Sequence, residues 1–309
     1  MGVNVPEASR TRSRPESWTE IGPGCFTRRY PSFDVTVGVV VGADGLLVVD
    51  TRGGPREADE LRADLARLSD LPVRWVVDTH WHFDHTFGNQ RFADAAIYGH
   101  ETVPGALAER GEEARAALAR RSPEWEQDMA ELVLTPPNRT FASVSVVDLG
   151  DRVVELVHPG RGHTDGDVSV RLPDADIVFA GDLVEESGPP AYGDDSFPLE
   201  WPSTLEVFTG LLTPASVVVP GHGAVVDQAF VTAQFGDVTA VAETIRRLAQ
   251  EGVPEAEALA AAEWPYPAER LAEAVHRGYR HLRESGVPTA GPAGPGPGPG
   301  RRSLPLLGQ

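Results

Sequence analysis

Residues 78–89 read DTHWHFDHTFGN, a stretch that places three histidines and one aspartate within six positions. The four side chains are His80, His82, Asp84 and His85. Neutral imidazoles and carboxylates are common ligands of zinc. A buried imidazole or carboxylate destabilises a fold unless it has a partner, and a metal centre can be the partner of all four. The stretch therefore predicts a metal cofactor and a metal-dependent chemistry.

The residues before this stretch predict where it lies in the fold. Residues 33–41 and 46–49 read as a strand hairpin that ends at Asp50. Residues 56–68 carry apolar side chains at helical spacing, and residues 73–78 form the next predicted strand. In α/β folds the loops after the C-terminal ends of strands carry the functional site. We therefore expect the histidine-rich stretch to lie on such a loop.

Three further residues of metal-binding type follow predicted strands later in the chain, namely His163, Asp182 and His222. Glycines flank each of them, and glycine permits the tight turns that aim a side chain inward. The strands in this half are predicted over residues 143–147, 152–158, 167–172, 177–179 and 216–219. With the histidine-rich stretch, this makes four loops that we expect to converge on one rim of the fold.

The pattern of residues divides the chain into four parts. Residues 1–20 are polar and predict a flexible N-terminal arm. Residues 21–226 contain the predicted strands and metal-type residues, and they predict a catalytic domain of two mixed sheets with helices on the outer faces. Residues 227–285 have helical periodicity and predict a C-terminal helical extension. Residues 286–309 repeat Gly-Pro and predict a disordered tail.

The composition argues against several kinds of partner. A net charge of −19 and a pI near 4.8, without a basic stripe, argue against nucleic acid. No apolar run is long enough to cross a membrane, and the polar first twenty residues predict a cytoplasmic protein. All 27 basic residues are arginine, which excludes lysine Schiff-base chemistry. The single cysteine, Cys25, cannot form an internal disulfide.

Five segments occur in the order of the sequence motifs of a known superfamily of metallohydrolases. They are centred on Asp50, on the stretch from His80 to His85, and on His163, Asp182 and His222. On these motifs the chain resembles the metallo-β-lactamase superfamily, though it is not a close match to the true β-lactamases. The resemblance implies an α/β fold, a four-layer αβ/βα sandwich with a C-terminal helical extension. It also implies a two-metal site in the cleft between the halves of the sandwich.

The resemblance further implies a glyoxalase-II-like ligand set for two zinc ions, with iron as an alternative metal. The first ion would be held by His80, His82 and His163, the second by Asp84, His85 and His222, and Asp182 would bridge them. In this chemistry a hydroxide shared by the two ions attacks a carbonyl carbon. Asp84 would be the catalytic residue that orients the hydroxide and accepts its proton.

Four other residues are expected to support the site. Asp50 and Thr164 are expected to anchor a ligand or its loop by hydrogen bonds and not to bind metal. The loop over residues 185–198 is expected to contact the substrate, with Tyr192 donating a hydrogen bond to an oxyanion. Arg161 is expected to meet a substrate carboxylate.

The leading hypothesis is therefore a dinuclear zinc hydrolase of a small acyl substrate, an ester, lactone, thioester or amide. One alternative is a mononuclear iron oxidoreductase similar to persulfide dioxygenases, which share part of the ligand set. A second is a β-lactamase-type antibiotic hydrolase, which is disfavoured because the chain lacks the cysteine and the lysine used by one lactamase subclass. The expected partner is a small-molecule substrate, and the C-terminal helices are expected either to cover the cleft or to form a homodimer contact.

Overall fold

The computed structural model describes residues 17–286, so residues 1–16 of the predicted arm and the tail after Gly286 lie outside the described residues. The arm is expected to reach residue 20, but Thr19 and Glu20 already belong to a strand, β1 (Thr19–Gly22). This strand pairs with β2 (Cys25–Arg29), and Gly24 between them has the positive φ of 66° that a tight turn requires. The folded part therefore begins within the segment that composition alone assigns to the arm.

The first sheet has seven strands in the order β1-β2-β3-β4-β5-β6-β7. The strands after the first two are β3 (Thr36–Val41), β4 (Leu46–Val49), β5 (Val73–Val77), β6 (Ala96–His100) and β7 (Arg139–Phe141). Strands β1 to β4 pair antiparallel, whereas β4 to β7 pair parallel. Parallel strands end at a common edge, and the histidine-rich stretch leaves β5 at that edge.

The second sheet has six strands in the order β13-β12-β11-β10-β9-β8. Their bounds are β8 (Val144–Asp148), β9 (Val153–Val157), β10 (Ser169–Leu172), β11 (Ile177–Glu185), β12 (Val217–His222) and β13 (Val226–Asp227). Strand β11 is longer than the predicted 177–179 and contains Asp182, which we expected on a loop. It pairs parallel with β12, with register shifts on both sides of Gly181.

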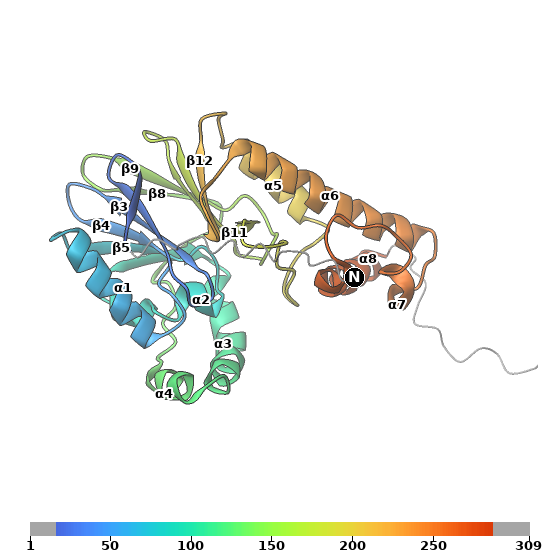
Figure 1. Cartoon of the computed structure of the whole chain (residues 1–309), viewed down its shortest axis with the longest axis horizontal. Helices are drawn as coiled ribbons and strands as arrows, with labels where there is room; N and C mark the ends of the chain where they lie inside the picture. The colour runs from blue at the N-terminus through green and yellow to red at the C-terminus, as the bar shows by residue number, and fades with distance from the viewer. Residues whose placement is uncertain (1–16, 287–309) are drawn as a thin grey trace, which may run out of the picture.

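Helices flank the outer sides of the two sheets, and the last ones in the chain extend away from them (Figure 1). They are α1 (Pro55–Leu68), α2 (Phe83–Thr86), α3 (Val103–Ala119), α4 (Pro123–Glu131), α5 (Trp201–Thr209), α6 (Gln228–Gln250), α7 (Glu255–Ala258) and α8 (Ala272–Glu284), with 3₁₀ turns at Asn89–Phe92 and Ala268–Arg270. Leu61 and Leu65 of α1 pack on the first sheet. Phe208 of α5 and Val241 of α6 belong to a core cluster that also includes Val178 and Val218 of the second sheet.

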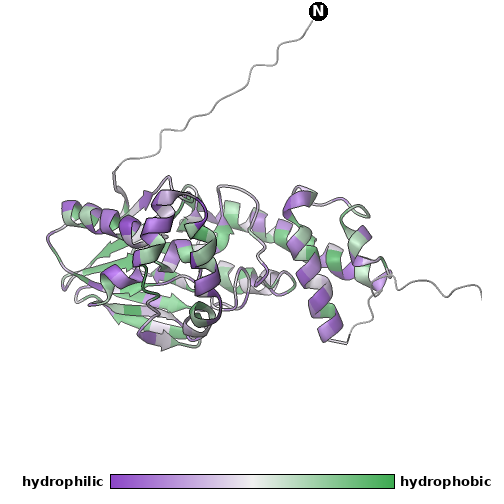
Figure 2. Ribbon diagram, turned by 90° about the horizontal axis from the view of Figure 1, so that it is seen from below, coloured by the Kyte–Doolittle hydropathy of each residue, from purple (hydrophilic) through white to green (hydrophobic). Residues whose placement is uncertain are grey.

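The inner faces of the two sheets meet in an apolar core that includes Val40, Val77, Phe179 and Val219. The sheets approach so closely that a Cβ at Gly38 would lie 2.2 Å from the Phe179 ring. Each fully buried side chain of this size contributes about 1.5–3 kcal/mol to folding. Figure 2 shows the same layering, with apolar residues along the strands and polar residues on the outer helices. The expected four-layer αβ/βα sandwich is confirmed.

The C-terminal helices form an extension beside the sandwich. Helix α6 begins where the Asp227 side chain accepts a hydrogen bond from Phe230 N, and it runs away from the sheets towards α7 and α8 (Figure 1). It packs against both α5 and α8. No helix within residues 17–286 has the length and apolar character needed to cross a membrane.

Candidate metal centre

The histidine-rich stretch turns sharply between the end of β5 and the start of α2. His80 and His82 lie on the extended turn, and Asp84 and His85 lie in the short helix α2. The Thr86 hydroxyl closes the turn by donating to the carbonyl oxygens of Trp81 and His82, at 2.9 and 3.0 Å. This closure directs both the extended and the helical side chains to the same edge of the sheet.

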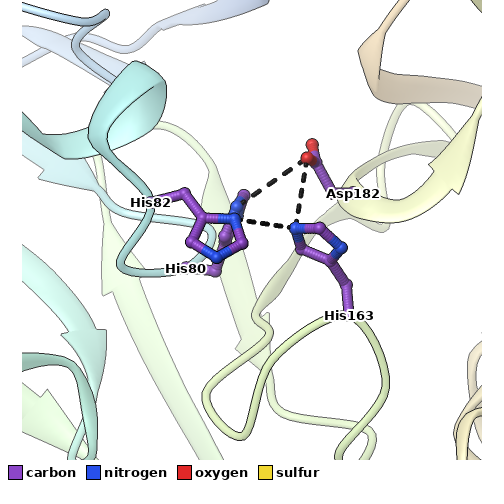
Figure 3. A group of neighbouring side chains, drawn as sticks. All are labelled: His80, His82, His163 and Asp182. Carbon is purple, nitrogen blue, oxygen red and sulfur yellow. Dashed lines mark hydrogen bonds and ion pairs between the residues drawn. The ribbon is translucent and has the colours of Figure 1, made fainter. Parts of the chain in front are cut away.

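One group of side chains collects His80, His82, His163 and Asp182, whose ligand atoms all lie within 4.8 Å of one another (Figure 3). The Oδ2 atom of Asp182 lies 3.4 Å from His163 Nε2 and 3.8 Å from His80 Nε2. His163 Nε2 also lies 2.9 Å from His82 Nδ1. Figure 3 shows these four side chains pointing towards one another from three separate segments.

A second group collects Asp84, His85 and His222. His222 Nε2 lies 3.4 Å from both His85 Nε2 and Asp84 Oδ2. Asp182 contacts this group as well, because its Oδ1 lies 3.4 Å from His85 Nε2 and its Oδ2 lies 3.2 Å from His222 Nε2. The structure thus brings all seven predicted ligands together, with Asp182 between the two groups.

Glu185 is an additional acid at this centre that the sequence analysis did not single out. It forms a third group with Asp182 and His222 within 4.8 Å, and it pairs in register with His222 across β11 and β12. Ser187 donates to its carboxylate through N at 3.1 Å and through its hydroxyl at 2.5 Å. Burial raises the pKa of Glu185 to about 7, and the charge of Asp182 adds to this effect. The longer course of β11 is what brings Glu185 to the site.

The residues fit a divalent metal centre. Among the described residues, His80 Nε2 and Asp182 Oδ1 are buried atoms without a hydrogen-bond partner. Pairs of imidazole nitrogens also face each other closely, between His82 and His163 and between His85 and His222. Buried polar atoms require partners, and two imidazole lone pairs require a proton or a cation between them. The nitrogen and carboxylate donor set is one that suits zinc.

The two groups differ in charge state. Burial lowers the pKa of His80 well below its ordinary value and that of His163 to about 4, so both rings are neutral at pH 7. Burial also opposes charge on His85 and His222, but nearby carboxylates, Asp182 foremost, outweigh it. They raise the pKa of His85 to about 9 and that of His222 to about 11. Without a cation, these two rings hold protons at neutral pH.

The family of the chain follows from comparison with known proteins. The family model of the metallo-β-lactamase superfamily matches residues 31–222, a range that contains all three groups described above. The chain belongs to this superfamily. The match confirms the resemblance read from the five motifs, and it leaves α6, α7 and α8 outside the matched range.

Curated relatives in the superfamily carry different names. A metallo-β-lactamase type 2 of Bacillus cereus is 27% identical over 186 residues, which cover 60% of this chain and 65% of that protein. The human protein named acyl-coenzyme A thioesterase MBLAC2 is 27% identical over 224 residues, covering 65% of this chain and 79% of its own length. The chain thus spans about two thirds of the length of the Bacillus cereus relative.

Solved structures of the superfamily share the fold. A metallo-β-lactamase from Pontibacter korlensis superposes with a TM-score of 0.57 at 24% identity, covering 72% of this chain and 98% of that one. The mono-zinc form of the metallo-β-lactamase FIM-1 from Pseudomonas aeruginosa superposes with a TM-score of 0.58 at 19% identity, covering 73% and 96%. At these identities the likeness concerns the sandwich alone.

Residues outside the three groups form hydrogen bonds that hold the predicted metal ligands in place. The carbonyl oxygen of Ala191 accepts from His163 Nδ1 at 2.8 Å, and that of Phe33 accepts from His222 Nδ1 at 2.9 Å. Asp50 accepts from His85, which agrees with an anchoring position. Thr164 donates through its hydroxyl to the Asp167 carboxylate at 2.6 Å, so its hydrogen bond orders the loop that carries His163.

Asp195 is a further residue that the sequence analysis missed. Its Oδ2 accepts hydrogen bonds from Trp81 Nε1 at 2.7 Å and from His82 Nε2 at 3.1 Å. It belongs to the loop between β11 and α5, and it follows no motif of the superfamily that we recognised. The only sequence signal is that this loop comes directly after the strand that carries Asp182.

The structure does not place the two predicted substrate contacts as expected. Tyr192 is buried in the core against Trp201, with ring centroids 5.0 Å apart, so its hydroxyl is not at an exposed rim. Arg161 makes a two-point ion pair with Glu200 at 2.9 and 2.7 Å, which already supplies its carboxylate partner.

Proposed function

We propose that this chain is a metal-dependent hydrolase of small acyl substrates that holds two zinc ions. The observation that carries the proposal is the position of Asp182, within 3.4 Å of histidines from both ligand groups. The buried atoms without partners, His80 Nε2 and Asp182 Oδ1, support a cation at this position. Membership of the metallo-β-lactamase superfamily supports hydrolysis as the type of reaction.

The proposed ligands divide as the distances do. The first zinc ion would be held by His80, His82 and His163, the second by Asp84, His85 and His222, with Asp182 shared. When bound, the ions would supply Lewis-acid polarisation of the substrate carbonyl and a lowered pKa for the attacking water. The alternative of one iron ion would use the first group alone and would leave the second group without a role.

The residues around the metal have defined tasks in this proposal. Asp84 is 12% exposed, so its carboxylate can face a substrate, and we assign it the proton that leaves the attacking water. His85 is fully buried and is held by Asp50, so it can bind and orient but has no access to substrate. Dense packing around His80 and His163 excludes bulk water from that side of the site.

Among acyl substrates we propose thioesters as the first class to test. Relatives named acyl-coenzyme A thioesterase occur in several vertebrates, including one from Gallus gallus that is 32% identical over 181 residues, covering 53% of this chain. Esters, lactones and amides stay within the proposal. A β-lactam is the alternative amide, and the name of the Bacillus cereus relative is its support. A cytoplasmic location and a homodimer stay predictions.

Purified full-length protein tests the proposal in two measurements. Elemental analysis should find zinc, with two ions per chain, and panels of thioesters, esters, lactones and β-lactams should reveal hydrolysis of at least one class. His82→Ala and Asp182→Ala should lose both metal and turnover. Zinc-loaded protein that hydrolyses none of these substrates would contradict the hydrolase proposal, and iron bound at one ion per chain would favour the oxidoreductase alternative.

A further inference from the structure

Asp195 connects two neighbouring side chains of the histidine-rich stretch to the loop between β11 and α5. Both of its hydrogen bonds use Oδ2, which accepts from Trp81 Nε1 at 2.7 Å and from His82 Nε2 at 3.1 Å. The Asp195 side chain is 13% exposed, so the carboxylate is mostly shielded from water. A single carboxylate oxygen therefore sets the position of two consecutive residues that lie more than a hundred positions earlier in the chain.

The bond to His82 has a consequence for the opposite side of the imidazole ring. A neutral imidazole carries its proton on one nitrogen and a lone pair on the other. Because His82 Nε2 faces the Asp195 carboxylate, the proton belongs on Nε2 and the lone pair on Nδ1. Nδ1 is the atom that points into the first ligand group, 2.9 Å from His163 Nε2. The bond thus selects the tautomer that can bind metal.

The loop that carries Asp195 is itself held from several directions. Arg277 of α8 donates through Nε to the Ser196 carbonyl oxygen at 2.9 Å, and Phe197 N donates to the Gly162 carbonyl oxygen at 2.8 Å. Arg246 of α6 donates to the Leu199 carbonyl oxygen at 2.6 Å. Two of these three contacts come from the C-terminal helices, which lie outside the range matched by the superfamily. The helices therefore support the backbone that follows Asp195 in the loop.

We propose that Asp195 is a positioning residue that fixes the tautomer and orientation of His82 for the first zinc ion. The C-terminal helices take part indirectly, because Arg277 and Arg246 hold the loop from which Asp195 reaches His82. This inference rests on the proposed metal centre. It adds a residue and a structural element that the five motifs do not contain.

Zinc affinity of the full chain, measured by competition with a chromophoric chelator, tests the role of Asp195. Asp195→Ala should weaken the first zinc site by about 10- to 100-fold, the usual cost of losing a hydrogen bond to a ligand histidine. Asp195→Asn should recover most of the affinity, because its amide oxygen can occupy the position of Oδ2 and accept from both donors. Loss of affinity in Asp195→Asn as large as in Asp195→Ala would contradict the proposal.

Two control variants separate the bond to His82 from other effects. Asp194→Ala removes the neighbouring carboxylate, which is 77% exposed and pairs with Arg110, and it should leave zinc affinity unchanged. Trp81→Phe removes the other donor to Asp195 and should keep the affinity, since the bond to His82 remains. A loss in Trp81→Phe as large as in Asp195→Ala would show that Asp195 acts on the fold through Trp81, which would overturn the proposal.

The outcomes also separate this inference from the proposed function. If the wild-type chain binds no zinc, the metal centre and the role of Asp195 are both wrong. If the wild type binds zinc and Asp195→Ala binds it equally well, only the role of Asp195 is wrong. Melting temperatures of all variants verify folding. If Asp195→Ala does not fold, the zinc affinities of Asp195→Asn and Trp81→Phe are compared instead. Full zinc affinity in Asp195→Asn together with a loss in Trp81→Phe would overturn the proposal.

Discussion

The Asp50 carboxylate holds His85 from the side opposite to the ligand group. Its Oδ2 accepts from His85 Nδ1 at 2.8 Å, which leaves His85 Nε2 directed at Asp182 and His222. The same carboxylate accepts from Thr79 through N at 2.8 Å and through the hydroxyl at 2.9 Å. Asp50 thereby links the end of β4 to the start of the histidine-rich stretch. It does so from a left-handed backbone conformation, with a φ of 66°.

Asp50→Ala should therefore weaken the second metal position and lower stability. The change leaves buried donors of Thr79 and His85 without an acceptor, which costs about 1–3 kcal/mol for each unsatisfied group. Urea unfolding should report the loss of stability, and elemental analysis should report less than the wild-type zinc content. Asp50→Asn keeps one acceptor oxygen and tolerates the positive φ. Its stability and zinc content should therefore lie between those of the wild type and those of Asp50→Ala. Wild-type zinc content in Asp50→Ala would refute this account.

Zinc binding should release protons unequally from the two positions. His85 and His222 have pKa values near 9 and 11, so both are protonated at pH 7 and must lose a proton before they bind a cation. At the first position, His80 and His163 are already neutral and have no proton to lose, and the Asp195 carboxylate raises the pKa of His82. The first position should therefore fill before the second as the pH rises.

Titration calorimetry in buffers of different ionisation enthalpy measures this release. The second ion should displace about two protons at neutral pH, and below about pH 9 its affinity should fall by about 100-fold for each pH unit. The affinity of the first ion should depend less steeply on pH. Equal proton release for both ions would show that the assignment of charge to the two groups is wrong.

Gly221→Ala should disrupt the centre without removing any ligand. A Cβ at Gly221 would lie 1.9 Å from Asp182 Oδ1, so the carboxylate would have to move away from the histidines. We expect loss of zinc and of turnover, with a cost of about 1–3 kcal/mol from overpacking. The matched control is Gly236→Ala on α6, where nothing lies within 4 Å of the added Cβ. It should keep zinc and gain about 0.5–1 kcal/mol of stability.

Asp167 should make the unfolding free energy depend on pH. Burial raises its pKa from 3.8 to about 7, although hydrogen bonds from Thr164 oppose the shift. Between these values the folded state binds a proton that the unfolded state has lost, so stability falls as the pH rises from about 4 to about 7. The loss is on the order of a few kcal/mol and is complete above that window.

Asp167→Asn cannot ionise and should lack this slope, while its amide oxygen can still accept from Thr164. The difference in unfolding free energy between variant and wild type, measured by urea titration across the window, isolates the contribution of Asp167. A constant difference from pH 4 to pH 7 would mean that Asp167 does not titrate there.

Predictions from the sequence succeeded where a short segment determines its own secondary structure. The hairpin before Asp50, the strand before His80 and the helix after residue 55 form close to their expected bounds, since each depends on local alternation or helical spacing. The expected end of β11 at residue 179 was wrong, because the strand continues through Gly181 and Asp182 and stays buried as far as Glu185.

The predictions failed where the path of a loop decides the contact. Tyr192 was assigned to the substrate from its place in the loop after Asp182, and Arg161 from its place beside His163. Tyr192 instead lies in the core, and Arg161 pairs with Glu200. Asp195 and Glu185 were overlooked for the same reason. Neither lies in a motif, and both reach the site only through the backbone that follows Asp182.

The sequence by itself determined the donor types, their order and their local spacing, because a strand end followed by a short helix presents His80, His82, Asp84 and His85 on one side whatever the rest of the chain does. Only the tertiary structure decided which oxygen of Asp182 meets which histidine and which tautomer His82 adopts. Those relationships join residues about a hundred positions apart. They depend on how two sheets pack face to face, and packing is a property of the whole core and not of any one segment.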